Sequence, residues 1–376
     1  MELELLTSLS QINAAEWDAL APPGHPLLSH HFLHGLETSG CTTEDAGWQP
    51  CHLRLWDGDK TLALAPSYLK SHSYGEYVFD WAWADAWHRS GLNYYPKLVT
   101  GIPFTPATGP RLLLAQDADA DAVYAALIAG VSQWAQQQSV SSWHLLFPEQ
   151  SVCDSLAEKG MHRRVATQFH WHNRGYRDFD DFLDTFSSRK RKSLRRERRR
   201  VQEQGLKLHT LVGNDINAGH WGQFYRFYQM TYAKRSGHGG YLSREFFTQV
   251  AASMGDRAVM VLAEHESGPV AAALYFRSND TLFGRYWGCI KEFDCLHFEA
   301  CYYRGIEYCI AEGINTFDPG AQGEHKIQRG FEPRLTFSNH WIAEPGLDAA
   351  VADFTAREAE QVEAYRKEAA TLLPFK

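Results

Sequence analysis

An internal repeat at an offset of 170 residues limits the fold of this chain more than any other feature. Residues 159–171 align with residues 329–341 without a gap, and Gly, Arg, His and Trp coincide at four of these 13 positions. Three further pairs match in chemical kind, and Phe147 falls on Phe317 at the same offset. A repeat of this length predicts two pseudo-equivalent domains rather than a solenoid of short units.

The length and hydrophobic content of the chain also fit two domains. A chain of 376 residues is longer than one hydrophobic core usually supports, and with 44% hydrophobic residues it has enough apolar side chains for two cores. We place the domains at residues 1–172 and 173–376, so that each contains one copy of the repeat.

Hydrophobic patterning in the first half predicts alternating strands and helices. Two apolar runs, 51–57 and 61–70, flank Asp57-Gly58-Asp59 and predict a β-hairpin. Residues 119–138 predict an amphipathic helix, and the apolar run 143–147 predicts a buried strand.

The second half repeats this order of elements. Residues 179–204 predict one long helix, and further helices are expected near 218–233 and 243–253. A hairpin around Ser267-Gly268 precedes a strand at 282–288. The pattern then predicts a helix at 297–312, a strand near 334–342 and a C-terminal helix at 348–371. The fold class predicted for both halves is therefore α/β, in a mixed α+β arrangement.

Composition excludes several classes of protein. The net charge of −8 predicts no global attraction to nucleic acid or to an anionic membrane. The seven Cys form no CxxC pair, so we expect neither a metal site nor a disulfide framework, but reduced thiols in a cytosolic protein. The N-terminus does not resemble a signal peptide, and no run of about 18 apolar residues predicts a membrane span. A cytoplasmic location is therefore expected, and the oligomeric state is left open.

One dense cluster of positive charge departs from the acidic average. Nine of the twelve residues 189–200 are Lys or Arg. Helical spacing places Lys192, Arg195, Arg196 and Arg199 on one face, where like charges repel unless an anion neutralises them. The cluster, with Lys190, Arg195 and Arg196 as candidate ligands, predicts contact with a phosphate-rich substrate or a tRNA backbone. The alternative is a solvated, charge-rich helix.

A polar loop follows a short buried strand near the end of the second half. Two glycines in residues 318–331 allow the backbone to approach a ligand closely, and ligands in α/β sheets bind beyond the C-terminal ends of strands. The alternative is a charged surface loop. The candidate site residues of this loop are Asp318, Gln322, Glu324, His325, Lys326 and Arg329.

Two aromatic segments provide further candidates for substrate contact. The strand at 282–288 contributes four of them: Arg285, Tyr286, Trp287 and Gly288. Residues 71–85 form an aromatic loop with interleaved carboxylates, from which we select Glu76, Tyr77 and Asp80. These aromatic residues either shape an acceptor pocket or pack between the two halves, and the sequence favours neither role.

Several of these segments resemble known families. The order of elements in each half resembles the GNAT acyltransferase fold, and two fused GNAT-like halves resemble the Fem-type transferases that add amino acids to peptidoglycan precursors. The basic run fits the Fem-like K-x-R-x-x-[IL]-R-R pattern loosely, and Lys326 to Phe331 fits K-x-x-x-G-F. The aromatic loop is similar to that of bacterial FemAB-like predicted N-acyltransferases, and the likeness extends over about residues 25–345.

The resemblance implies an acyl donor that binds against the strand 282–288. In a GNAT fold the donor's pantetheine lies along this strand, and its pyrophosphate caps the next helix. However, the usual [RQ]-x-x-G-x-[GA] signature is absent, and residues 288–294 are bulky and acidic. This departure weakens the case for acetyl-CoA and strengthens the case for aminoacyl-tRNA or another carrier. In either case no tightly bound cofactor is expected.

The chemistry expected of an N-acyltransferase assigns provisional roles. The chain has no G-x-S-x-G elbow and no Cys with an evident His partner, so the amine acceptor is expected to attack the donor directly in a ternary complex. The base is Asp318 or Glu324, with His325 as an alternative, and Tyr302 or Tyr303 reprotonates the leaving group. Backbone N–H groups of residues 286–288 would stabilise the oxyanion. Lys190, Arg195 and Lys326 would hold phosphate or carboxylate groups.

Three functions remain open from the sequence. The first is an acyl-CoA-dependent transferase that acts on a small-molecule or peptide amine. The second is a Fem-type transferase that uses aminoacyl-tRNA and a peptidoglycan precursor. The third is a non-catalytic RNA-binding protein that uses the basic helix.

Overall fold

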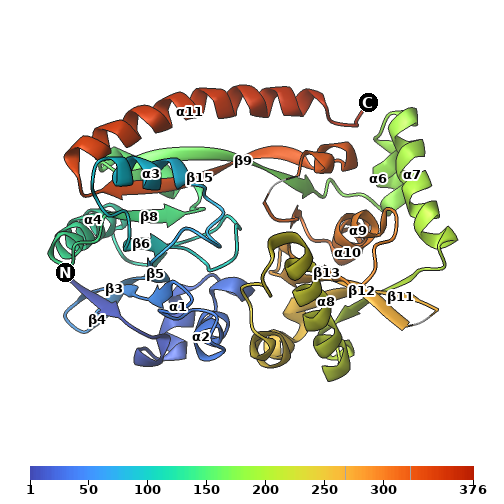
Figure 1. Ribbon diagram of the computed structural model, residues 1–376, viewed down its shortest axis with the longest axis horizontal. Helices are drawn as coiled ribbons and strands as arrows, with labels where there is room; N and C mark the ends of the chain where they lie inside the picture. The colour runs from blue at the N-terminus through green and yellow to red at the C-terminus, as the bar shows by residue number, and fades with distance from the viewer. Residues whose placement is uncertain (267, 322) are drawn as a thin grey trace. The chain divides into compact units, whose positions relative to one another are not determined.

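A computed structural model describes residues 1–266, 268–321 and 323–376 (Figure 1). The chain divides into two compact units, and neither is a continuous stretch. Unit 1 comprises residues 1–23, 27–167 and 335–365, and unit 2 comprises residues 24–26, 168–334 and 366–376. The chain enters unit 2 briefly at residues 24–26, and its main crossing, between residues 167 and 168, lies close to the expected boundary at 172. Residues 335–365, which the sequence places in the second domain, pack in unit 1 because their strand pairs there.

Unit 1 contains two sheets and the helices that cover them. Its strands are β1 (Glu2–Leu6), β2 (Trp48–Pro50), β3 (His52–Asp57), β4 (Lys60–Ala65), β5 (Ser67–Lys70), β6 (Lys97–Thr100), β7 (Leu113–Leu114) and β8 (Ser142–Leu146). Its helices are α1 (Ala14–Leu20), α2 (His30–Thr38), α3 (Trp81–Arg89), α4 (Ala120–Gln137) and α5 (Gln150–Glu158). Three elements have residues in both units: β9 (His162–His172), β15 (Glu332–Ile342) and α11 (Pro345–Thr371).

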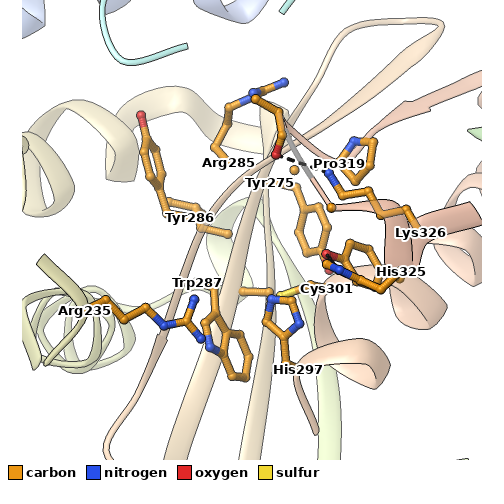
Figure 2. Close-up of a pocket in the computed structure, with 16 residues that line it drawn as sticks. Arg235, Tyr275, Arg285, Tyr286, Trp287, His297, Cys301, Pro319, His325 and Lys326 are labelled. Carbon is orange, nitrogen blue, oxygen red and sulfur yellow. Dashed lines mark hydrogen bonds between the residues drawn. The ribbon is translucent and has the colours of Figure 1, made fainter. Parts of the chain in front are cut away.

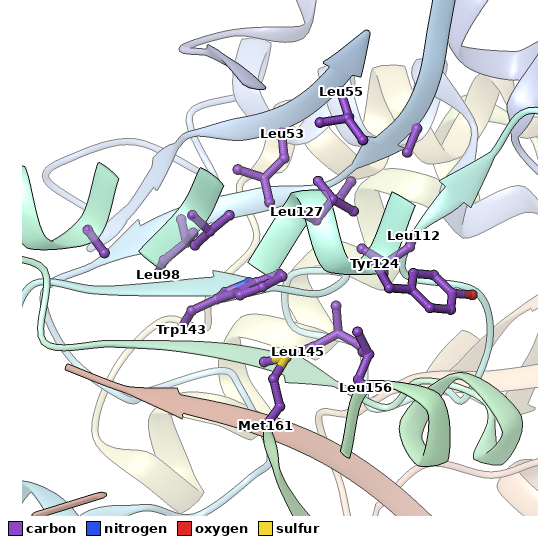
Figure 3. Close-up of a cluster of buried hydrophobic side chains, with 14 of the residues drawn as sticks. Leu53, Leu55, Leu98, Leu112, Tyr124, Leu127, Trp143, Leu145, Leu156 and Met161 are labelled. Carbon is purple, nitrogen blue, oxygen red and sulfur yellow. The ribbon is translucent and has the colours of Figure 1, made fainter. Parts of the chain in front are cut away.

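The core of unit 1 lies between α4 and the strands beside it. One sheet has the order β1-β3-β4-β7, and the other, within this unit, runs β15-β8-β6-β5-β2. Leu127 of α4 packs with Leu53 of β3, Leu98 of β6 and Trp143 of β8, all of them buried (Figure 3). Complete burial of side chains of this size contributes about 1.5–3 kcal/mol each. The periodic apolar face predicted for 119–138 therefore holds the two sheets of unit 1 together.

Unit 2 is a sheet with helices on both faces. Its strands are β10 (Lys207–Val212), β11 (Ala258–His265), β12 (Gly268–Arg277), β13 (Thr281–Cys289) and β14 (Thr316–Asp318). Its helices are α6 (Phe179–Asp184), α7 (Ser188–Glu203), α8 (Ala218–Ser236), a π-helix (Phe246–Val250), α9 (Leu296–Phe298), a second π-helix (Glu299–Tyr303) and α10 (Arg304–Glu312). Within unit 2 the strand order is β10-β11-β12-β13-β14-β9.

Both units repeat one topology, which accounts for the offset of 170. In unit 1, β6 is parallel to β8, and β8 is antiparallel to β15; in unit 2, β13 is parallel to β14, and β14 is antiparallel to β9. A helical crossover joins the parallel pair in each case, α4 in one and α9–α10 in the other. The bounds of β9 and β15 differ by 170 at both ends, so the repeated segment is the closing strand.

Two expected helices differ from the structure. The single helix predicted for 179–204 is two helices, because Phe186 between them is fully buried and bridges Phe375 near the C-terminus. The helix predicted for 243–253 is a π-helix followed by a 3₁₀ segment. The hairpin turn predicted at Ser267-Gly268 lies partly outside the described residues, which omit Ser267. No helix in the described ranges combines the length and apolarity that crossing a bilayer requires.

Candidate functional site

A pocket of about 420 Å³ opens in unit 2 where two parallel strands part (Figure 2). β13 and β14 pair over only three residues, Thr281–Phe283 against Thr316–Asp318. The pocket is lined by the residues that come next on each strand, 284–287 on β13 and Pro319 after β14. Such an opening at the C-terminal end of a strand is the usual place for a ligand in an α/β sheet.

A β-bulge shapes the wall of this pocket. The register between β12 and β13 shifts between Leu274 and Tyr275, whose partners are Tyr286 and Gly284, so Arg285 has no residue directly opposite. Bulges re-aim side chains and often lie beside functional sites. A Cβ on Gly284 would lie 3.3 Å from the Cα of Pro319, so glycine allows the two strands to come this close as they separate.

The two faces of β13 pack against different helices. A Cβ on Gly288 would lie 2.3 Å from the carbonyl carbon of Phe227 in α8, so only glycine permits this contact. Trp287 contacts His297 of the α9 segment, with ring centroids 5.4 Å apart. The π-helix that continues from α9 presents Cys301 and Tyr302 to the pocket. π-Helical turns of this kind recur at functional sites.

Asp318 lies behind the pocket wall in a buried ion pair. Its Oδ2 is 2.7 Å from Nη2 of Arg285, and the two side chains are 3% and 1% exposed. Its Oδ1 accepts the N–H of Gly320 at 2.8 Å and lies 3.8 Å from the ring of His170. Burial would raise the pKa of Asp318, but Arg285 and His170 together hold it below its ordinary value. The carboxylate is therefore charged, and its oxygens already interact with Arg285, Gly320 and His170.

Lys326 is the cation at the base of the pocket. Its Nζ donates to the carbonyl oxygens of Gly320 at 2.7 Å and Ala321 at 3.4 Å, and the residue is 2% exposed. Burial lowers the pKa of Lys326 to about 8, although the charge of Asp318 opposes the shift. The same loop backbone thus links the Arg285–Asp318 pair to the ammonium group of Lys326.

Tyr302 and His325 form a hydrogen-bonded pair in the same pocket. The Oη of Tyr302 is 2.9 Å from Nε2 of His325. Burial, Arg329 and Lys326 lower the pKa of His325, so its imidazole is neutral at neutral pH. Burial raises the pKa of Tyr302, so its phenol keeps its proton. A neutral imidazole beside a protonated phenol is able to take up one proton and release another.

Cys301 lines the pocket but is a poor nucleophile. Burial raises the pKa of its thiol far above the ordinary value. The reactive form of cysteine is the thiolate, which is therefore scarce here. In the described part of the chain, no group of His, Cys, Asp and Glu is arranged to hold a metal ion.

Two further candidates of the polar loop, Glu324 and Arg329, are not among the described residues that line the pocket. Glu324 is exposed. Arg329 is buried, donates to Glu197 of α7 at 2.8 Å and lies 3.5 Å from the ring centroid of Phe298, so it anchors α7 to the loop. Gln322 falls outside the residues that the structure describes.

The basic helix α7 lies outside this pocket as well. Lys190 donates to Gln328, and Arg195 pairs with Asp180 at 2.9 Å on the surface. Arg195 and Arg199 line a separate groove of about 780 Å³. Arg196 is exposed. The structure therefore separates two groups of candidates that the sequence treats together.

The candidates in the aromatic loop of unit 1 are largely internal. Glu76 and Asp80 are each 3% exposed, and both accept hydrogen bonds from the buried Nζ of Lys97. The same ammonium donates to Ser73 Oγ at 2.8 Å. Tyr77 is half-buried with a left-handed backbone (φ 62°). Glu76 and Asp80 therefore fasten the loop to unit 1 and do not face solvent.

Several residues that line the pocket are not among the candidates predicted from the sequence. Arg235 comes from the end of α8, His297 from α9 and Tyr275 from β12. Tyr275 and His297 lie in elements with an ordinary apolar pattern, so nothing marked them. Arg235 lies in the polar run 234–241, whose composition signals only a surface loop.

Comparison with known proteins places the chain in a family. A model of the FemAB-like family, described as acting in peptidoglycan biosynthesis or recognition, matches residues 8–376, and the chain belongs to this family. A search of curated protein sequences finds no significant match.

Solved structures with a similar fold share little sequence with the chain. FemX is 10% identical with a TM-score of 0.55, over 94% of this chain and 100% of FemX. The C-terminal domain of a putative lysylphosphatidylglycerol synthetase from Agrobacterium fabrum is 9% identical with a TM-score of 0.54, over 93% and 97%. L-PGS from Bacillus licheniformis is 12% identical with a TM-score of 0.50, over 85% and 95%. The prediction of a mixed α+β fold with tandem GNAT-like units is confirmed.

Proposed function

We propose that the chain is an N-acyltransferase that moves an acyl group, preferably an aminoacyl group from tRNA, to an amine of a peptidoglycan precursor. The observation that carries this proposal is the grouping of Lys326, His325 and Tyr302 in one pocket where β13 and β14 part. Membership of a family described by peptidoglycan biosynthesis or recognition supports the choice of acceptor.

The amine of the acceptor attacks the donor's carbonyl carbon directly. The new C–N bond forms first and gives a tetrahedral oxyanion, which collapses as the ester C–O bond breaks. Direct attack needs no covalent enzyme intermediate, and the Cys301 thiol, which stays protonated, is not suited to form one. The Tyr302–His325 pair takes the proton from the attacking amine and returns one to the leaving oxygen. Of the three candidate bases, His325 is the neutral one that lines the pocket, whereas Asp318 is held by Arg285.

Lys326 would stabilise the oxyanion that develops during this attack. Its ammonium group is fixed by two backbone carbonyls, so little reorganisation is needed as negative charge appears. Backbone N–H groups of residues 286–288 remain the proposed additional donors. Arg285 and Asp318 act through the loop backbone as positioning residues.

Two features of unit 2 favour tRNA over CoA as the carrier. The loop after β13, where a CoA pyrophosphate would bind, lacks the usual [RQ]-x-x-G-x-[GA] signature, and its Glu292 and Asp294 already pair with Lys234 and Arg200. On α7, in contrast, Lys192, Arg196 and Arg199 are exposed and have no hydrogen bond or ion pair with another described residue. Such a row of cations is suited to the phosphates of an RNA backbone.

The aromatic loop of unit 1 presents exposed rings, which we propose as a ligand-binding platform within that unit. Tyr74, Phe79 and Trp81 are 56%, 51% and 44% exposed, and the rings of Tyr74 and Trp81 lie 5.2 Å apart. The buried ammonium of Lys97 fixes the loop that carries Tyr74 and Trp81 through hydrogen bonds to Ser73 and Glu76. A fixed platform of exposed aromatic rings suits the apolar faces of a sugar or peptide.

A direct transfer assay tests the proposal. The purified chain would be mixed with a UDP-linked muropeptide and either charged tRNA or acetyl-CoA, and the products followed by mass spectrometry. We expect aminoacylated muropeptide from charged tRNA, and loss of at least about a hundredfold in rate for Lys326→Met. Salt-dependent RNA binding without transfer from either donor would favour the non-catalytic alternative instead.

A further inference from the structure

Two adjacent cations at the end of α8 have different environments. Lys234 pairs with Glu292 at 2.5 Å, and both side chains are well exposed. Arg235 is exposed too, but it lines the pocket and has no hydrogen bond or ion pair with any other described residue. Figure 2 shows its side chain extending from α8 toward Trp287. The protein thus leaves one guanidinium without a partner at the edge of the candidate active site.

The charge of the pocket lining is one-sided. Its described members include Arg235, Arg285 and Lys326, and none of them is Asp or Glu. Asp318 balances the charge of Arg285 from behind the wall, which leaves two cations uncompensated. The lowered pKa of His297, about 3, arises first from burial and then from His325 and Arg235, so the charge of Arg235 acts inside the pocket.

We propose that Arg235 binds an oxyanion, a carboxylate or a phosphate, on the substrate that occupies this pocket. The guanidinium group is planar and always charged, and it binds such groups through two parallel hydrogen bonds. The oxyanion lies at the rim, beside Trp287, while Lys326 serves the reacting carbonyl at the base. The identity of the substrate rests on the proposed function, but the oxyanion site does not.

The same charge distribution disfavours one class of acyl group. A lysyl or arginyl donor would bring a cation into a pocket that already holds two, without a described carboxylate in the lining to receive it. Neutral or acidic acyl groups meet no such penalty. Donors with cationic side chains are therefore disfavoured as substrates.

Calorimetric titration with three probes tests the site and identifies the source of the oxyanion. Coenzyme A and adenosine monophosphate supply phosphates, and N-acetylglycine supplies a lone carboxylate. We expect at least one probe to bind the native chain. Arg235→Gln should raise the Kd of that probe about tenfold or more, and the Kd of Arg235→Lys should lie between the values for the native chain and Arg235→Gln. The matched control Lys234→Gln removes the neighbouring charge and should leave the Kd within about twofold.

Three results would overturn the proposal: no probe binds the native chain, Arg235→Gln binds as well as the native chain, or Lys234→Gln weakens binding equally. A transfer assay separates this inference from the proposed function. If Arg235-dependent binding persists without transfer from any donor, the proposed function fails and the oxyanion site stands. If transfer occurs and Arg235→Gln changes neither KM nor the preference against lysyl donors, the inference alone fails.

Discussion

The carboxylate of Asp318 lies 2.7 Å from the guanidinium of Arg285, and both side chains are almost completely buried. The same carboxylate accepts the N–H of Gly320, whose carbonyl oxygen accepts a hydrogen bond from Lys326. A buried ion pair behind the pocket therefore fixes the loop that holds the pocket's central cation. This relationship makes Asp318 a positioning residue in the proposed mechanism rather than its base.

Asp318→Asn should destabilise the protein strongly. The substitution leaves the guanidinium of Arg285 buried without a counter-charge, which costs about 3–5 kcal/mol in the free energy of unfolding. Urea unfolding followed by circular dichroism measures this cost. The matched control is Asp180→Asn, which breaks the exposed pair with Arg195 and should cost less than about 1 kcal/mol. Equal effects from the two substitutions would contradict the role assigned to Asp318.

The rate of transfer should have a bell-shaped dependence on pH. His325 must be neutral to accept a proton, and its lowered pKa places the acid limb below pH 6.5. Lys326 must be charged to stabilise the oxyanion, and its pKa places the basic limb near pH 8. Profiles of kcat/KM against pH for the native chain and two variants provide the test. His325→Gln should remove the acid limb, and Lys326→Arg should move the basic limb upward; unchanged limbs would show that other groups titrate.

The sequence predicts some parts of this architecture well because they depend on local pattern. The closing strands β9 and β15 appear as an ungapped repeat, and the loop with His325 and Lys326 stands out by its glycines and charges. The partners of those residues are not local. Arg285 is 33 residues from Asp318, and the break at Phe186 depends on its pairing with Phe375. Neither contact has a signal in the spacing of nearby residues.

Domain membership is a second case in which long-range contacts decide. Residues 335–365 include the end of the second copy of the repeat and the segment after it, yet they pack in unit 1, because Ser338–Ile342 pairs with β8. The carboxylates of the aromatic loop illustrate the same limit. A sequence shows Glu76 and Asp80 among exposed aromatic residues, but only the fold places Lys97 between them.

Glu76 and Asp80 should respond to pH in opposite ways. Burial, followed by the opposing charge of Lys97, leaves the pKa of Glu76 raised to about 7, whereas Lys97 and its hydrogen bonds outweigh burial and lower the pKa of Asp80. Glu76 thus contributes stability below pH 4.5 that is lost as the pH rises through 7. The loss amounts to about 3 kcal/mol, since one pKa unit corresponds to about 1.4 kcal/mol.

Urea unfolding at pH 5 and pH 8 for two isosteric variants tests this difference. Glu76→Gln should lose less stability at pH 8 than at pH 5, because it removes a carboxyl group that is costly to ionise in the fold. Asp80→Asn should be destabilising at both values, because the Asp80 carboxylate is charged throughout this range. If the loss of unfolding free energy changed equally between pH 5 and pH 8 in the two variants, the pKa values of Glu76 and Asp80 would not be shifted in opposite directions.

The exposed cations of α7 should determine how RNA affinity depends on salt. If Arg196 and Arg199 each neutralise one phosphate, changing both to Gln should reduce the slope of log K against log salt by about 1.4–1.8. The matched control changes Lys207 and Arg334, two exposed cations of unit 2 outside α7, and should leave the slope unaltered. Fluorescence anisotropy with labelled tRNA between 50 and about 200 mM salt measures these slopes. An equal reduction in both double variants would mean that RNA affinity depends on the overall charge of the protein and not on the face of α7. An unchanged slope in the α7 variant would mean that the tRNA binds elsewhere on the protein.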